Sequence, residues 1–206
     1  MRDEYRLHFQ RHRETIDHRL AEFRALPPEE FLWELCYCLL TPGSRALHAA
    51  QAVAELRRDG FLVRRFDPTP YLRDRRHYIR FHNRKGERLL AIAEQGEAIM
   101  EILCDRGTDA SAKRDRLVAH VCGLGWKEAS HLLRNIGFLD LAILDRHILK
   151  HLHRCNAIDT LPDAIGSRRR YLEIEDRFRQ LADSFGLSLQ QLDLLFWSLE
   201  EGSVRK

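Results

Sequence analysis

Two glycines and a lysine lie close together past the middle of the chain, in a pattern suited to chemistry beside a phosphate. The segment 121–127 reads Val-Cys-Gly-Leu-Gly-Trp-Lys, with an apolar helical pattern on each side. Gly123 and Gly125 permit a tight turn and close backbone approach. A helix that begins near Trp126 directs its first N–H groups and its positive dipole end at that turn. The sequence therefore predicts a helix–hairpin–helix that binds a nucleic-acid phosphate without reading base sequence.

Lys127 and Asp145 add reactive groups to this turn. A helix N-terminus disfavours a cation, which favours the neutral amine that attacks an electrophilic carbon such as that of a sugar. Each residue also has an ordinary structural interpretation: Lys127 as an exposed lysine of a first helical turn, and Asp145 as the N-cap of the next helix. Together with the hairpin, the pair favours a catalytic lysine assisted by a carboxylate.

A second group of residues could contact DNA. Between Arg73 and Arg88 there are seven basic residues and two acidic ones, interleaved with Tyr78 and Phe81. A basic loop that carries aromatic side chains suits phosphate contact and base stacking. The alternative is a solvated charged face whose two aromatic residues point inward.

The composition excludes several classes of protein. The 206 residues are 44% hydrophobic, which argues against disorder, and no apolar run is long enough to cross a bilayer. The N-terminus is charged, so no signal segment is expected and the expected compartment is the cytoplasm. Five scattered cysteines predict buried free thiols, with no metal and no cofactor. The net charge of +3, from 34 basic and 31 acidic residues, is weak evidence for nucleic acid.

The elements that must position these groups are helices. Apolar residues recur at helical spacing through most of the chain, and no segment alternates as a strand would. We expect an all-α fold of about ten helices with short connections. Pro28 begins a helix, residues 89–103 carry one apolar helical stripe, and Ser188 with Gln191 has the spacing of a capping box for the last helix.

The hairpin and the residues that follow it resemble those of a known family. Residues 121–127, followed by Leu-Asp-Arg-His-Ile at 144–148, resemble the signature of the helix–hairpin–helix DNA glycosylase/lyase superfamily. Further segments are similar to its archaeal-type branch, the second family of 8-oxoguanine DNA glycosylases/AP lyases: 38–42, 79–85, 127–131 and 192–197. The likeness covers nearly all of the chain. The cluster-binding cysteines of the endonuclease III relatives are absent, as this branch implies.

The resemblance implies two helical lobes, of residues 28–137 and of 1–27 with 138–206, with a cleft between them. The lesion base would be flipped into that cleft. Lys127 would attack the sugar and expel the base, Asp145 would assist it, and elimination would cut the strand 3′ to the abasic site. The family pattern assigns Phe81, Trp197 and the terminal Lys206 to recognition of the base. Asp193 is a further candidate for contact with the base, and its alternative role is to cap a helix or pair with an arginine.

The sequence therefore predicts a base-excision repair enzyme that acts as a monomer on double-stranded DNA containing oxidised guanine, with no membrane partner. Two alternatives stay open. One is a helix–hairpin–helix glycosylase for another oxidised base, and the other is a non-catalytic DNA-binding protein with the same motif. Phosphate binding alone does not require the Lys127–Asp145 pair, so that pair favours an enzyme.

Overall fold

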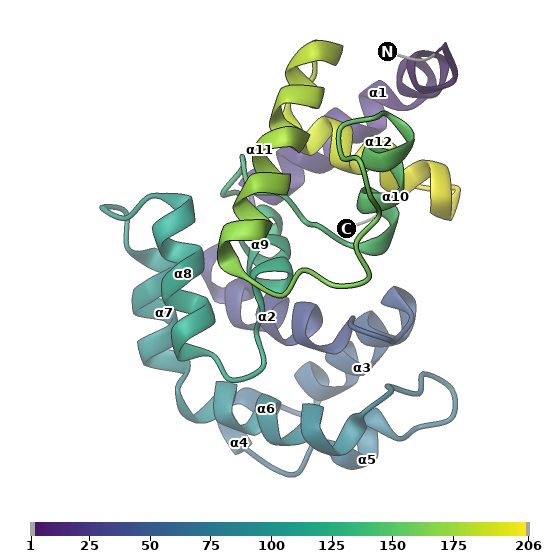
Figure 1. Ribbon diagram of the computed structural model, residues 1–206. Helices are drawn as coiled ribbons and strands as arrows, with labels where there is room; N and C mark the ends of the chain where they lie inside the picture. Colours follow the sequence, from purple (N-terminus) through teal and green to yellow (C-terminus); the bar gives the residue numbers. More distant parts are fainter. Residues whose placement is uncertain (1–2, 205–206) are drawn as a thin grey trace. The chain divides into compact units, whose positions relative to one another are not determined.

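The computed structural model describes residues 3–204, in which helices are joined by turns and irregular loops (Figure 1). Over these residues the chain forms twelve α-helices and one short 3-10 helix, without a strand. The predicted all-α class is confirmed. None of the described helices combines the length and the apolar character needed to cross a membrane.

The chain divides into two compact units. Unit 1 comprises residues 1–26 and 133–206, and unit 2 comprises residues 27–132. Unit 2 is thus one continuous stretch inserted into a unit built from both ends of the chain. The boundary falls within helix α9, Trp126–Asn135, whose residues up to Leu132 belong to unit 2.

Unit 2 is organised around a buried central helix. Its helices are η1 Pro28–Glu30, α2 Phe31–Leu40, α3 Ala46–Arg58, α4 Phe61–Arg64, α5 Thr69–Leu72, α6 His82–Glu94, α7 Gly96–Cys104 and α8 Ala110–His120. Helix α2 contacts α3, α6 and α7. Six consecutive residues of α2, from Leu35 to Leu40, are buried, and all six have hydrophobic side chains. Burial of apolar area on this scale is the main stabilising contribution to the unit.

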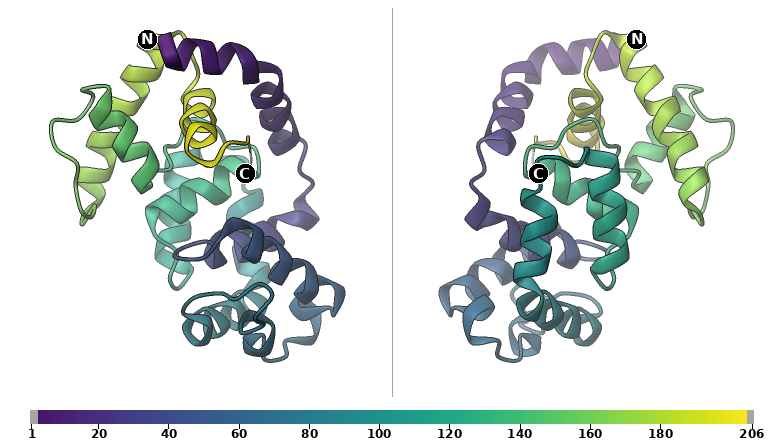
Figure 2. Two further views of the ribbon diagram at one scale, coloured as in Figure 1. Left: turned by 90° about the vertical axis from the view of Figure 1, so that its right-hand side faces the viewer. Right: turned by 90° about the vertical axis from the view of Figure 1, so that its left-hand side faces the viewer.

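Unit 1 is organised around its last helix. Its elements are α1 Asp3–Arg24, α10 Arg146–Arg154, α11 Arg168–Phe185 and α12 Leu189–Glu201. Helix α12 contacts α1, α10 and α11, and the N-terminal and C-terminal helices can be followed side by side in Figure 2. Tyr5, Phe178 and Phe196 form the buried aromatic centre, with Tyr5 and Phe196 rings 5.3 Å apart. The predicted capping box of Ser188 and Gln191 begins α12, and Gly202 in the left-handed region ends it.

Three expectations from the sequence need correction. The stripe of residues 89–103 is divided between α6 and α7, because the chain turns at Gln95 and Gly96, and glycine is a poor helix former. Helices α4 and α5 were not expected, since four residues are too few to show a period. The cysteines are free, but only Cys36 and Cys38 are fully buried, whereas Cys104 and Cys122 are exposed.

Candidate active site

The hairpin predicted at residues 121–125 joins α8 to α9. Gly123 has a φ of +81°, in the left-handed region that favours glycine. The Leu124 N–H donates to the Val121 carbonyl at 3.1 Å and closes the turn. The Gly125 carbonyl accepts from Ala129 at 2.9 Å, so α9 begins directly after the second glycine. The first turn of α9 therefore follows the hairpin as the sequence predicts.

Arg88 of α6 lies against the hairpin, a contact that the sequence does not predict. A Cβ atom on Gly123 would overlap the Arg88 side chain, so the missing side chain at this position makes room for the guanidinium. This close approach brings a positive charge to the turn, where it would attract a phosphate. The sequence marks Arg88 only as a member of the basic stretch. Because 35 residues separate Arg88 from Gly123, the sequence does not indicate that the two are in contact.

Lys127 lies in the first turn of α9, and its side chain is 29% exposed. Its Nζ forms an ion pair with Glu128 Oε1 at 3.0 Å. A second lysine nearby, Lys85, is buried and donates to the carbonyls of Leu40 and Pro42, each at 2.7 Å. Burial, followed by the charges of Arg88 and Lys127, lowers the Lys85 pKa to about 8. The hairpin of unit 2 therefore lies beside three cationic side chains and one carboxylate.

Phe81 is presented to solvent at the start of α6. Its backbone is in the left-handed region, with a φ of +61°, and the residue is 58% exposed. The Arg80 guanidinium lies 4.8 Å from the ring centroid, a cation–π contact. The basic stretch was expected to be a loop throughout, but it is irregular only as far as Phe81 and continues as a helix from His82. An exposed aromatic ring with a stacked arginine is suited to contact with a nucleic-acid base.

Asp145 caps α10 in unit 1, as the sequence predicts. Its Oδ1 accepts from the backbone N–H groups of His147 and Ile148, both at 2.9 Å. Its Oδ2 accepts from the indole Nε1 of Trp197 on α12 at 3.3 Å. Three donors therefore fix the carboxylate, and one of them belongs to a residue expected in the base pocket.

Asp193 lies one helical turn before Trp197 on α12 and is buried. It forms an ion pair with Arg134 of α9, with Nη1 and Oδ2 2.6 Å apart. Burial raises the Asp193 pKa to about 6; Arg134 opposes this shift, and the charge of Asp145 adds to it. The other oxygen, Oδ1, has no hydrogen-bond partner in the part of the chain that the structure describes. Arg134 gave no signal in the sequence beyond its place in an amphipathic helix.

The residues predicted from the sequence fall into two sets. Unit 2 holds the phosphate-binding glycines, the lysine and one aromatic residue: Gly123, Gly125, Lys127 and Phe81. Unit 1 brings together Asp145, Asp193 and Trp197. Lys206 lies outside the described residues. Sequence reasoning missed three charged neighbours: Arg88, Glu128 and Arg134.

The chain matches characterised proteins over most of its length. The family profile described as 8-oxoguanine DNA glycosylase (Ogg-HhH) matches residues 16–187. The 8-oxoguanine DNA glycosylase/AP lyase of Methanocaldococcus jannaschii is 37% identical over 198 residues, which cover 94% of this chain and 93% of that protein.

Solved structures agree with this match. The crystal structure of the 8-oxoguanine DNA glycosylase of Thermotoga maritima superimposes with a TM-score of 0.85 at 31% identity, covering 98% of this chain and 97% of that one. The M. jannaschii glycosylase/lyase in complex with a 15mer DNA containing 8-oxoguanine superimposes with a TM-score of 0.83 at 35% identity, covering 94% of this chain and 93% of that one.

Proposed function

The chain belongs to the family of 8-oxoguanine DNA glycosylases, and from this membership we propose that Lys127 is the nucleophile that excises the base, with Asp145 as its assistant. The protein is a bifunctional DNA N-glycosylase and AP lyase that acts on 8-oxoguanine in DNA. The observation that carries the residue assignment is the place of Lys127, a partly exposed amine in the helical turn that directly follows the hairpin.

The chemistry requires an amine with a free electron pair. The free electron pair of Lys127 Nζ forms a bond to C1′ of the deoxyribose as the bond from C1′ to the base breaks, and the base leaves with the electron pair of the broken bond. The sugar ring then opens to a Schiff base with the lysine. Loss of a proton from C2′ and departure of the 3′ phosphate cut the strand by β-elimination. The ion pair with Glu128 must open for the amine to attack.

Asp145 supplies negative charge where positive charge develops. The sugar gains cationic character as the base departs, and a fixed carboxylate stabilises that charge in the transition state. Two backbone N–H groups and the Trp197 indole hold the carboxylate in one orientation, so little reorganisation is needed during the reaction. Lys127 initiates both steps, whereas Asp145 acts through charge.

Binding to DNA is assigned to the remaining residues. Gly123 and Gly125 present backbone to a phosphate, with Arg88 beside them. Phe81 and Trp197 contact the flipped base by stacking, and Asp193 contacts its polar edge, as does the terminal Lys206. The protein binds double-stranded DNA as a monomer, in the cytoplasm and associated with the nucleoid.

Borohydride trapping on DNA with a single 8-oxoguanine tests the assignment. The wild-type protein should give a covalent adduct, and Lys127→Ala should lose it together with about 10³-fold or more of the excision rate. Lys150→Ala is the matched control, because Lys150 is an exposed lysine paired with Glu200 and should trap as the wild type does. An adduct of undiminished yield in Lys127→Ala would assign the chemistry to another amine.

A panel of duplexes with different lesions separates the alternatives. Family membership favours 8-oxoguanine, so its excision should exceed that of an oxidised pyrimidine such as thymine glycol. Equal or faster cutting of thymine glycol would favour a different lesion range. Binding without any strand cleavage by the folded wild-type protein would favour the non-catalytic alternative.

A further inference from the structure

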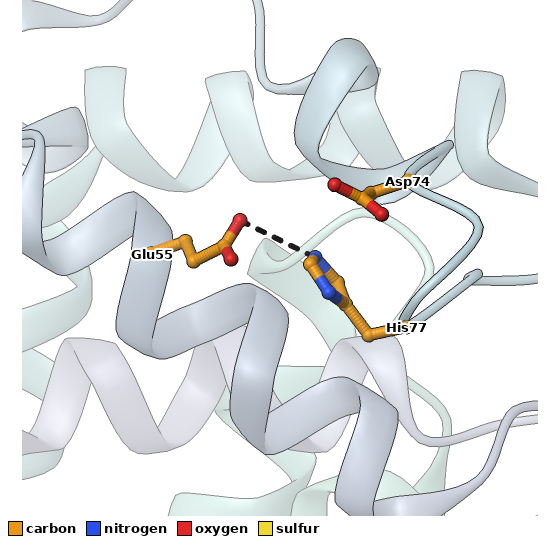
Figure 3. Close-up of side chains that lie close together, drawn as sticks. All are labelled: Glu55, Asp74 and His77. Carbon is orange, nitrogen blue, oxygen red and sulfur yellow. Dashed lines mark ion pairs between the residues drawn. The ribbon is translucent and has the colours of Figure 1, made fainter.

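Three metal-ligating side chains gather in unit 2, and none of them belongs to the residues assigned to the proposed reaction. Glu55 extends from α3, and Asp74 and His77 belong to the segment between α5 and α6 (Figure 3). Each offers one ligand atom, and these atoms all lie within 4.8 Å of one another. The cluster therefore joins two segments that are separated by about 20 residues in the chain.

His77 gives an independent reason to expect a ligand at this place. Its side chain is only 3% exposed, and its Nε2 has no hydrogen-bond partner among residues 3–204. The nitrogen faces Glu55 Oε2 at 3.4 Å, as the dashed line in Figure 3 marks. A buried polar atom without a hydrogen bond is costly and uncommon, and in folded proteins a bound ion or an ordered water often satisfies such an atom.

Arg76 already places positive charge at the same carboxylates. Its Nη2 lies 2.6 Å from Asp74 Oδ2 and 3.5 Å from Glu55 Oε1. The same guanidinium therefore bridges the two carboxylates that would ligate a cation. The Arg76 side chain is 74% exposed, and an exposed ion pair of this kind is weak. The guanidinium can therefore move aside for a competing cation.

We propose that Glu55, Asp74 and His77 form a binding site for a divalent transition-metal ion of the zinc type. One imidazole and two carboxylates suit zinc, whereas magnesium and calcium prefer oxygen ligands alone. Zinc bonds to these ligands are about 2.0–2.2 Å long, so the three side chains need small rotations to converge on one ion. Water completes the coordination.

The bound ion would anchor the segment that presents Phe81. His77 precedes Phe81 by four residues, and α3 is held by α2 in the core of unit 2. A metal bridge from Glu55 to Asp74 and His77 restricts this segment more strongly than the exposed Arg76 ion pairs do. The site is structural in kind, and it stands independently of the assignment of Lys127.

Isothermal titration of the full-length reduced protein with zinc chloride tests the site, with magnesium chloride as the negative probe. The wild type should bind one equivalent of zinc that Glu55→Gln and His77→Gln weaken by about 10-fold or more. Arg76→Gln should tighten binding several-fold, because the competing guanidinium is gone. His153→Gln is the matched control, an exposed histidine of α10 that should leave the affinity unchanged.

The exposed thiols are present in the wild type and in every variant, so zinc bound to them does not change between the proteins. A difference in zinc affinity between variants therefore reports on the proposed site. Zinc uptake that is equal in the wild type, Glu55→Gln and His77→Gln would overturn the proposal, as would no uptake by the wild type. Replacement of the buried His77 could prevent folding, which circular dichroism would detect. The Glu55 side chain is partly exposed, so Glu55→Gln tests the site even if His77→Gln does not fold. Weaker zinc binding by Arg76→Gln would contradict the proposal that the Arg76 guanidinium competes with zinc for the two carboxylates.

Discussion

At the scale of single residues, Asp193 is a buried carboxyl whose surroundings disfavour its charged form. It is buried beside Arg134, and burial outweighs the attraction of that cation, so the Asp193 pKa rises to about 6. The carboxyl is therefore ionised and paired at neutral pH and becomes protonated on mild acidification. An unfolded aspartate has a pKa near 3.9, so the folded protein binds this proton more tightly than the unfolded chain does.

The sign of the resulting pH dependence follows from linkage. Because the folded pKa is raised, the stabilising contribution of Asp193 is fully present below pH 4 and is lost as the pH rises through 6. We expect Asp193→Asn to lack this dependence. The free energy of unfolding of the wild type, relative to Asp193→Asn, should fall by about 2 kcal/mol between pH 4.5 and pH 7. Urea denaturation followed by circular dichroism measures it, and a rise with pH would contradict the assignment.

Single residues could be predicted where the cause is local. The N-cap role of Asp145 was predicted because its partners lie two and three residues further along the chain. The bond from Trp197 to the same carboxylate could not be predicted, since 52 residues separate the two and only the packing of α12 on α10 brings them together. For the same reason the Arg134–Asp193 pair was missed.

At the scale of elements, the hairpin between α8 and α9 combines a conformational and a steric requirement at one position. Gly123 adopts a positive φ, and the Arg88 side chain occupies the space where a Cβ would project. A residue with a side chain would therefore both strain the turn and displace the cation beside it. In the proposed function, the hairpin backbone and Arg88 of α6 bind the phosphate together.

Gly123→Ala should weaken both folding and DNA binding. The positive φ costs about 1–2 kcal/mol for an L-residue, and displacement of Arg88 should lower DNA affinity about 10-fold. Fluorescence anisotropy with a labelled duplex at fixed salt measures the affinity. Gly166→Ala is the matched control, because a Cβ there meets nothing within 4 Å. Equal affinities for the two variants would show that the turn does not hold the DNA.

Helices could be predicted from the sequence where they are long or begin with a recognisable capping residue. Long amphipathic helices such as α11, and the box that begins α12, follow from spacing alone. The division between α6 and α7 was missed because the apolar stripe continues across Gln95, and only backbone geometry shows the turn. Short helices without a full period, such as α4, lie below what a pattern can indicate.

At the scale of the whole molecule, charge is nearly balanced, and its local arrangement decides what can bind. The chain carries 34 basic and 31 acidic residues. In the basic stretch, Lys85 donates hydrogen bonds to backbone carbonyl groups, and Arg76 forms ion pairs with carboxylates. Arg75 and Arg84 are exposed, and neither pairs with a carboxylate within residues 3–204. They are therefore available to exchange counterions for a DNA phosphate.

The salt dependence of DNA binding should report these two arginines. Each phosphate contact contributes about 0.9 to the slope of log affinity against log salt concentration. Arg75→Ala with Arg84→Ala should therefore reduce that slope by about 2, measured between 50 and 200 mM salt. Arg169→Ala is the control, an exposed arginine of α11 paired with Glu173, and should leave the slope unchanged. An unaltered slope in the double variant would place the phosphate contacts elsewhere.

The insertion of unit 2 into unit 1 has a consequence for biosynthesis. Helix α1 leaves the ribosome well before its partner α12, which begins about 165 residues after α1 ends. At about 5–20 residues per second, that interval lasts roughly 10–30 s. During it the nascent α1 keeps Tyr5, Phe9, Ile16 and Leu20 uncovered, while residues 27–132 can already fold. Translation therefore completes the inserted unit first, and the flanking unit can form only after α12 has been synthesised.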